Sequence, residues 1–86
     1  MMNFKSVMIQ AVGAKPSGKK AAKKLNDNKN NHPLLWRGLH AVVSHRYEQD
    51  TGEKAPAMGA DWSALLDWLV ANLPKILALI LAIFGA

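Results

Sequence analysis

Apolar residues in the first twelve positions recur with the spacing of an α-helix. Phe4, Val7, Met8, Ala11 and Val12 fall at i, i+3, i+4, i+7 and i+8, which places them on one helix face. An isolated helix of this length is only marginally stable in water. We therefore expect this helix to lie against another apolar surface.

A second amphipathic helix is predicted over residues 33–48. Asn31 offers a capping side chain, and Pro33 suits the first turn of a helix. Gly38 weakens the helix by about 1 kcal/mol relative to alanine, so we expect packing to hold it. The apolar face of this helix consists of Leu35, Trp36, Leu39, Val42, Val43 and Tyr47.

Residues 62–84 form the most apolar stretch of the chain. Asp61 precedes them as a suitable N-cap. As one helix, this stretch is about 35 Å long, whereas the hydrocarbon core of a bilayer is about 30 Å thick. Pro74 is expected to kink the helix or split it in two, because its ring clashes with the carbonyl of Val70.

Insertion of this stretch as a lone transmembrane helix is close to energetic balance. Its Leu, Ile, Val and Phe side chains contribute together about −4 to −7 kcal/mol. Lys75, near the middle, costs roughly 3 kcal/mol, and Asp67 and Asn72 raise the cost further. Because polar groups at this depth usually find protein partners, we expect other helices to accompany this one.

A stripe of small and polar side chains along this helix is the predicted packing seam. Small residues let helix backbones approach closely, and Asp67 of one copy is placed to pair with Lys75 of another. The stripe consists of Ala64, Asp67, Ala71, Lys75, Ala78 and Ala82. The alternative is the core helix of a small soluble bundle, with its Leu-rich face buried and the stripe in water.

The run Ile76–Phe84 decides between these alternatives at the level of sequence. It is apolar on every side, which is typical of a helix in lipid or within a large assembly. A chain of 86 residues is not expected to cover it alone. The pattern therefore favours a membrane or a large assembly.

The net charge of +5 resides in the first third of the chain, where residues 1–31 carry seven lysines and one aspartate. The lysine pairs in residues 13–31 repel one another, and Gly and Pro interrupt the segment, so we expect a disordered basic arm. Such an arm can contact DNA, RNA or anionic lipid without reading sequence, or it can be a passive, solubilising segment. The candidate polyanion-binding residues are Lys15, Lys19, Lys20, Lys23, Lys24 and Lys29.

The sequence offers little for catalysis or for a cofactor. There is no cysteine, which removes disulfides, thiolate metal sites and thiol catalysis. His40 and His45 lie five residues apart, unlike the i, i+4 spacing of a helical zinc pair. Ser44 and His45 are neighbours that point in different directions on a helix. We therefore expect a protein that is not an enzyme and that uses no metal or other cofactor.

Four aromatic residues are candidate interface anchors. Trp36 and Tyr47 lie on the middle helix, and Trp62 and Trp68 lie near the start of the apolar stretch, as in an interfacial aromatic belt. The alternative for the first two is packing on the chain's own C-terminal helix.

Together these features predict an all-α protein with short helices, a long kinked hydrophobic C-terminal helix and an extended basic N-terminal arm. The predicted segments are residues 1–31 (amphipathic start and lysine-rich arm), 32–49 (amphipathic helix), 50–60 (linker) and 61–86 (hydrophobic helix).

The predicted function is that of a small structural, membrane-associated protein, present in several copies in a virion or another large assembly. Its partners would be a lipid membrane, further copies or other subunits, and nucleic acid or anionic lipid at the basic arm. The positive-inside rule places the arm on the cytoplasmic or nucleic-acid side of a virion or cytoplasmic membrane. The alternatives are a membrane-permeabilising peptide, such as a holin, toxin or bacteriocin, and a soluble adaptor whose C-terminal helix docks in a partner's groove.

Overall fold

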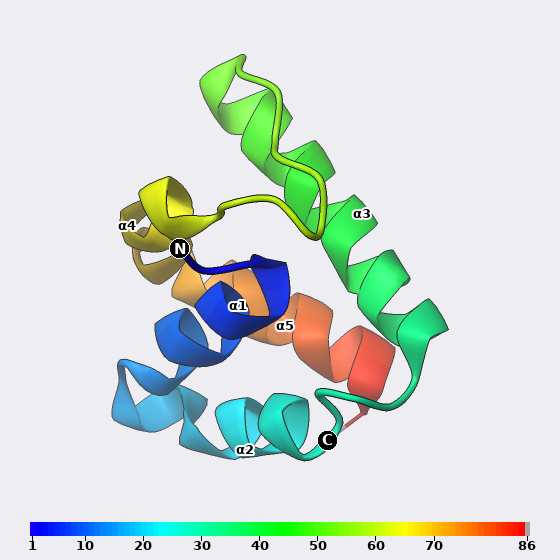
Figure 1. Cartoon of the computed structure of the whole chain (residues 1–86). Coiled ribbons are helices and arrows are strands. Elements are labelled where there is room, and N and C mark those ends of the chain that lie inside the picture. The colour runs from blue at the N-terminus through cyan, green and yellow to red at the C-terminus, as the bar shows by residue number, and fades with distance from the viewer. Residues whose placement is uncertain (86) are drawn as a thin grey trace.

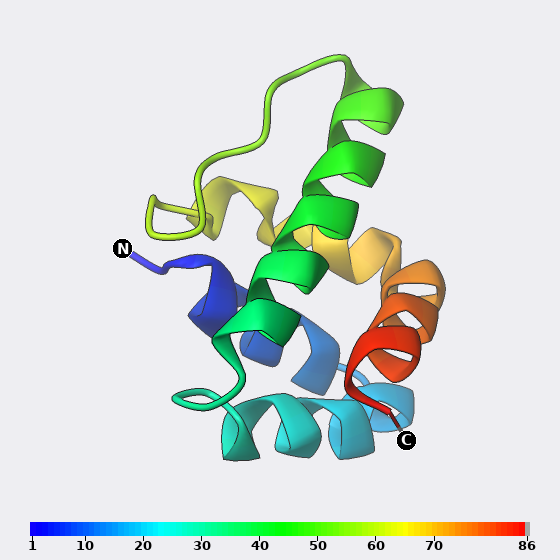
Figure 2. The ribbon, with the colours of Figure 1, turned by 90° about the vertical axis from the view of Figure 1, so that its right-hand side faces the viewer.

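Helices account for the regular structure of residues 1–85, the part of the chain that the computed structural model describes. They are α1 (Phe4–Gly13), η1 (Pro16–Gly18), α2 (Lys19–Asp27), α3 (Pro33–Thr51), η2 (Ser63–Leu65), α4 (Leu66–Ala71) and α5 (Leu73–Phe84), where η marks a 3₁₀ turn. The helix α1 contacts α2, α4 and α5, and α3 packs on α5 (Figures 1 and 2). The prediction of an all-α fold is confirmed.

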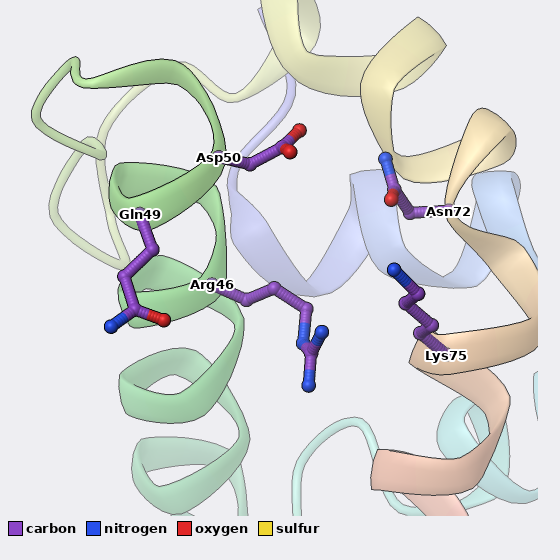
Figure 3. Close-up of a pocket in the computed structure, with 5 residues that line it drawn as sticks. All are labelled: Arg46, Gln49, Asp50, Asn72 and Lys75. Atoms are coloured by element: carbon purple, nitrogen blue, oxygen red, sulfur yellow. The ribbon is translucent and has the colours of Figure 1, made fainter.

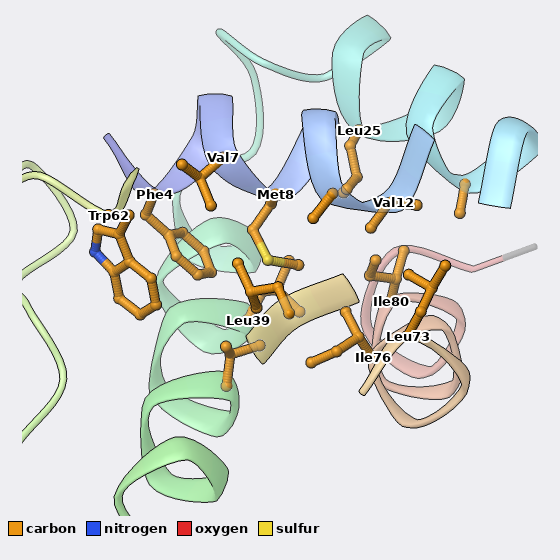
Figure 4. Close-up of a cluster of buried hydrophobic side chains, with 14 of the residues drawn as sticks. Phe4, Val7, Met8, Val12, Leu25, Leu39, Trp62, Leu73, Ile76 and Ile80 are labelled. Atoms are coloured by element: carbon orange, nitrogen blue, oxygen red, sulfur yellow. The ribbon is translucent and has the colours of Figure 1, made fainter. Parts of the chain in front are cut away.

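The first helix forms where its apolar spacing predicts it. Asn3 caps α1, since its side-chain oxygen accepts a hydrogen bond from the backbone N–H of Ser6 at 3.0 Å. All five residues of the predicted apolar face are buried. They point into the shared core, where they meet side chains from α2, α3 and α5 (Figure 4).

The predicted extended basic arm is wrong, because residues 13–31 are folded onto the rest of the chain. Helix α2 buries Ala21 and Leu25 against the core, while its lysines occupy the remaining faces. Gly18 lets the chain turn closely past α1, since a Cβ there would lie 1.9 Å from the carbonyl oxygen of Val12. Two well-placed apolar residues and one glycine therefore outweigh the repulsion between lysines.

Hydrogen bonds fasten the turn that follows α2. The indole N–H of Trp36 donates to the carbonyl of Asn28 at 2.8 Å. Lys5 Nζ donates to the carbonyl of Lys29 at 2.9 Å and lies 5.5 Å from the centre of the Trp36 ring. Two backbone carbonyls of this turn thus receive side-chain donors from α1 and α3, and that of Asn28 also accepts the backbone N–H of Asn31 at 3.1 Å.

The middle helix begins at the predicted residue and ends three residues later than predicted. Gly52 terminates α3 with a left-handed backbone, φ 75°, and donates to the carbonyl of Glu48 at 2.9 Å. The loop that follows runs back along α3 (Figure 2). It is held there by a 3.0 Å hydrogen bond between His40 Nε2 and the carbonyl of Pro56.

The predicted long C-terminal helix is two helices, bent by 95° at their junction. Asn72 ends α4, because both its backbone and side-chain N–H groups donate to the carbonyl of Trp68. Its own carbonyl then accepts the first hydrogen bonds of α5, from Lys75 and Ile76. Pro74 lies in the first turn of α5, where its missing N–H is tolerated. Of the two outcomes expected for this proline, the structure has the split.

Splitting the apolar stretch lets the small chain cover most of it. Ile76, Ile80 and Phe84 are buried in the core, and Leu81 is 50% exposed. The chain alone therefore covers one face of the run Ile76–Phe84, contrary to the expectation from the sequence. Among residues 1–85 no single helix has both the length and the apolar composition to cross a membrane, although the bent pair Ser63–Ala71 and Leu73–Phe84 together has them.

Aromatic side chains close the core beneath the loop of residues 52–62. Phe4 packs edge-to-face against both Trp36 and Trp62, with ring centres 6.4 Å and 4.8 Å apart. Asp61, at the end of this loop, accepts hydrogen bonds from the backbone N–H groups of Ser63 and Met2. Hydrogen bonds with the side chain and backbone of Ser63 lower the pKa of the Asp61 carboxyl below its ordinary value, and the bond from the backbone of Met2 lowers it to a smaller extent. The chain's start is therefore tied to η2.

Two glycine substitutions, one at a tightly packed position and one at an open position, should change the free energy of unfolding in opposite directions. Gly18→Ala should destabilise the protein by about 1–3 kcal/mol, as overpacking does, because its Cβ would meet the backbone of Val12. Gly38→Ala should stabilise it by about 1 kcal/mol, since a Cβ at this position meets no atom within 4 Å apart from its chain neighbours and the nearby backbone of α3 itself. Urea unfolding measures both. Equal effects of the two changes would contradict the close approach of η1 to α1.

Candidate functional site

The predicted polyanion-binding lysines lie on and beside α2. Four of them are exposed, and Lys24 and Lys29 are half-buried. The exposed four are Lys15, Lys19, Lys20 and Lys23. Because α2 is helical, Lys20 and Lys24 are one turn apart on the side that faces α5.

A hollow of about 210 Å³ lies between α2 and the C-terminal end of α5, and we name it the α2–α5 hollow. Both ribbon views place that end of α5 beside α2 (Figures 1 and 2). Most of its wall is apolar. Its lining residues are Lys20, Ala21, Lys24, Ile80, Leu81 and Gly85. Two lysine residues therefore contribute to the wall of an apolar depression that also includes the half-exposed Leu81.

The charges around this hollow are largely uncompensated. Over residues 1–85 the one ion pair is that between Lys23 and Asp27, at 3.0 Å, and Asp27 is the sole acidic residue among residues 1–31. Lys20 and Lys24 thus have no carboxylate within ion-pair distance in the described chain. Such a surface attracts anions by long-range electrostatics.

All six residues of the predicted packing stripe are exposed. Ala64, Asp67 and Ala71 precede the 95° bend, and Lys75, Ala78 and Ala82 follow it. The stripe is therefore split between two differently directed helices. Within the described chain it makes no ion pair, and it remains available to other molecules.

The four predicted aromatic anchors divide into two pairs. Trp36 and Trp62 are fully buried, so in this structure they are core residues and do not lie at a surface. Tyr47 and Trp68 are half-buried and pack edge-to-face, 5.1 Å apart. The indole N–H of Trp68 donates to Asp50 Oδ2 at 2.7 Å. This second pair joins α3 to α4.

Sequence reasoning missed the apolar half of the site. Ile80 and Leu81 lie more than fifty residues from Lys20 and Lys24 along the chain, so no local spacing connects them. Nor does the sequence pattern indicate Arg46, which faces Lys75 across a separate cleft between α3 and α5. No group of three or more His, Asp or Glu side chains able to hold a metal ion occurs within residues 1–85.

Comparison with protein-family models, curated proteins and solved structures gives no match.

Proposed function

We propose that this chain is a small, non-enzymatic structural protein that docks as a folded unit on an anionic membrane. The observation that supports it best is the α2–α5 hollow, where Lys20 and Lys24 flank a mainly apolar wall that includes Leu81. Lysine side chains attract acidic headgroups, and apolar side chains enter the region beneath them.

The combination of charge and apolar surface favours lipid over nucleic acid as the partner. Each lysine near an anionic membrane contributes about 1 kcal/mol of attraction. An exposed leucine gains free energy by entering lipid, whereas it gains little on a sugar–phosphate backbone. No aromatic side chain able to stack on bases lies within residues 13–31. Interfacial docking also leaves the core intact.

Membership in a multi-copy assembly, such as a virion with a membrane, is part of the proposal. The exposed stripe of small residues on α4 and α5 supports contacts between copies, because alanines permit close approach of helices. The adaptor alternative has less support, since the apolar face of α5 is already covered by the chain's own core.

Flotation with vesicles containing phosphatidylserine tests whether the protein docks on lipid through the α2–α5 hollow. The double variant Lys20→Gln/Lys24→Gln should bind about 30-fold more weakly, from about 1 kcal/mol per lysine. Leu81→Gln should bind about fivefold more weakly, because part of a leucine no longer enters lipid. High salt should release the wild-type protein, since its attachment is interfacial.

Matched controls lie elsewhere on the surface. Arg37→Gln/Lys54→Gln removes the same charge, and Leu34→Gln removes a leucine that is 74% exposed. If these controls weaken flotation as much as the site variants, charge and hydrophobicity act without a docking surface. If Leu81→Gln has no effect while duplex DNA competes fully, nucleic acid replaces lipid as the partner.

A membrane-permeabilising role is the second candidate, and the bent helix pair favours it. Straightening at Asn72 would join α4 and α5 into a stretch whose length and composition suit a membrane span. Dye release from the same vesicles at micromolar protein would support this role, as would protein that resists carbonate extraction. Intact vesicles together with release of the protein by salt would contradict it and leave interfacial docking.

A further inference from the structure

A second concentration of positive charge lies on another part of the molecule, in a cleft between α3 and the junction of α4 with α5. The cleft has a volume of about 180 Å³ and is lined by Arg46, Gln49, Asp50, Asn72 and Lys75. Arg46 extends from α3 and Lys75 from α5, and both side chains point into the same space (Figure 3). The lining is mainly polar.

The two cations face each other without an acidic side chain that pairs with either. In the described residues neither Arg46 nor Lys75 has a carboxylate within 4.0 Å. The nearby Asp50 is held instead by the indole N–H of Trp68, which donates to its Oδ2 at 2.7 Å. Lys75 also lies in the first turn of α5, where the helix dipole disfavours a cation.

An anion bound between these cations would relieve both unfavourable features. Arginine presents a planar set of donors that matches a tetrahedral oxyanion, and lysine adds a compact charge. Asp50 Oδ1, which accepts no hydrogen bond from the protein in the described structure, adds a constraint: an anion beside it should carry a hydroxyl donor. Hydrogen phosphate carries both acceptor oxygens and a hydroxyl, and a phosphate monoester carries a hydroxyl when it is the monoanion, below its second pKa of about 6. Sulfate at neutral pH carries no hydroxyl.

We propose that Arg46 and Lys75 form a binding cleft for a phosphate monoester or free phosphate. In this cleft Asp50 accepts a hydrogen bond from the hydroxyl of the phosphate group. The cleft uses none of the residues of the α2–α5 hollow, so it stands independently of membrane docking. The phosphate group bound in this cleft belongs either to a soluble phosphate compound or to a lipid whose headgroup is a phosphate monoester.

Phosphate titration followed by NMR tests the cleft. In the intact ¹⁵N-labelled protein, the indole N–H signal of Trp68, identified with Trp68→Phe, should shift saturably with inorganic phosphate at constant ionic strength. Arg46→Gln and Lys75→Gln should each weaken binding about tenfold or more, as loss of a charged hydrogen bond does. Arg37→Gln/Lys54→Gln should leave it unchanged, and so should Lys20→Gln/Lys24→Gln, which reports separately on docking.

The result that overturns the proposal is the absence of a saturable shift, or a shift that survives in both cleft variants. An equal response to sulfate would overturn the assignment of a hydroxyl-bearing phosphate. Vesicles containing phosphatidic acid, compared with phosphatidylserine vesicles, distinguish the sources. Stronger flotation on phosphatidic acid that is lost in Arg46→Gln identifies a lipid, and equal flotation together with the phosphate-induced shift identifies a soluble compound.

Discussion

Burial of the apolar face of α1 is the interaction on which the rest of the structure depends. This face carries five apolar side chains, and all of them are covered. Helix α2 covers one side by placing Leu25 on it, and α5 covers another with Ile76 and Ile80 (Figure 4). Because α1 alone is too short to be stable in water, we expect it to depend on the core that the first third of the chain shares with the last third. The basic segment and the hydrophobic segment are therefore parts of one core.

The sequence predicted the helices whose apolar periodicity is strong. Apolar spacing and proline placement predict the buried residues of α1, the start of α3 and a break of the last helix near Pro74, and the structure has all three. The folding of residues 13–31 could not be predicted from composition, because the segment is rich in lysine and Ala21 and Leu25 are its only buried apolar side chains. The direction of α5 was equally hidden, since a 95° turn at Asn72 depends on which surface its apolar face meets.

The residues of the α2–α5 hollow likewise could be predicted only in part from the sequence. Its lysines were identified from the charge distribution, yet their neighbours Ile80 and Leu81 come from the opposite end of the chain. The cleft of Arg46 and Lys75 likewise joins α3 to α5. A single sequence indicates which residues are charged or apolar, whereas the pairing of distant segments follows from tertiary packing. Both surfaces are consequences of α5 folding back over the molecule.

Hydrogen exchange of the backbone amides of α2 tests the central claim most directly. We expect slowed exchange for the amides of residues 23–27, whose N–H groups are hydrogen-bonded within a helix that packs on α1. We also expect that α2 and α5 remain protected when the protein is bound to vesicles, because docking leaves the core intact. Exchange of α2 at the rate of an unstructured chain in the free protein would contradict the account and restore a disordered basic arm.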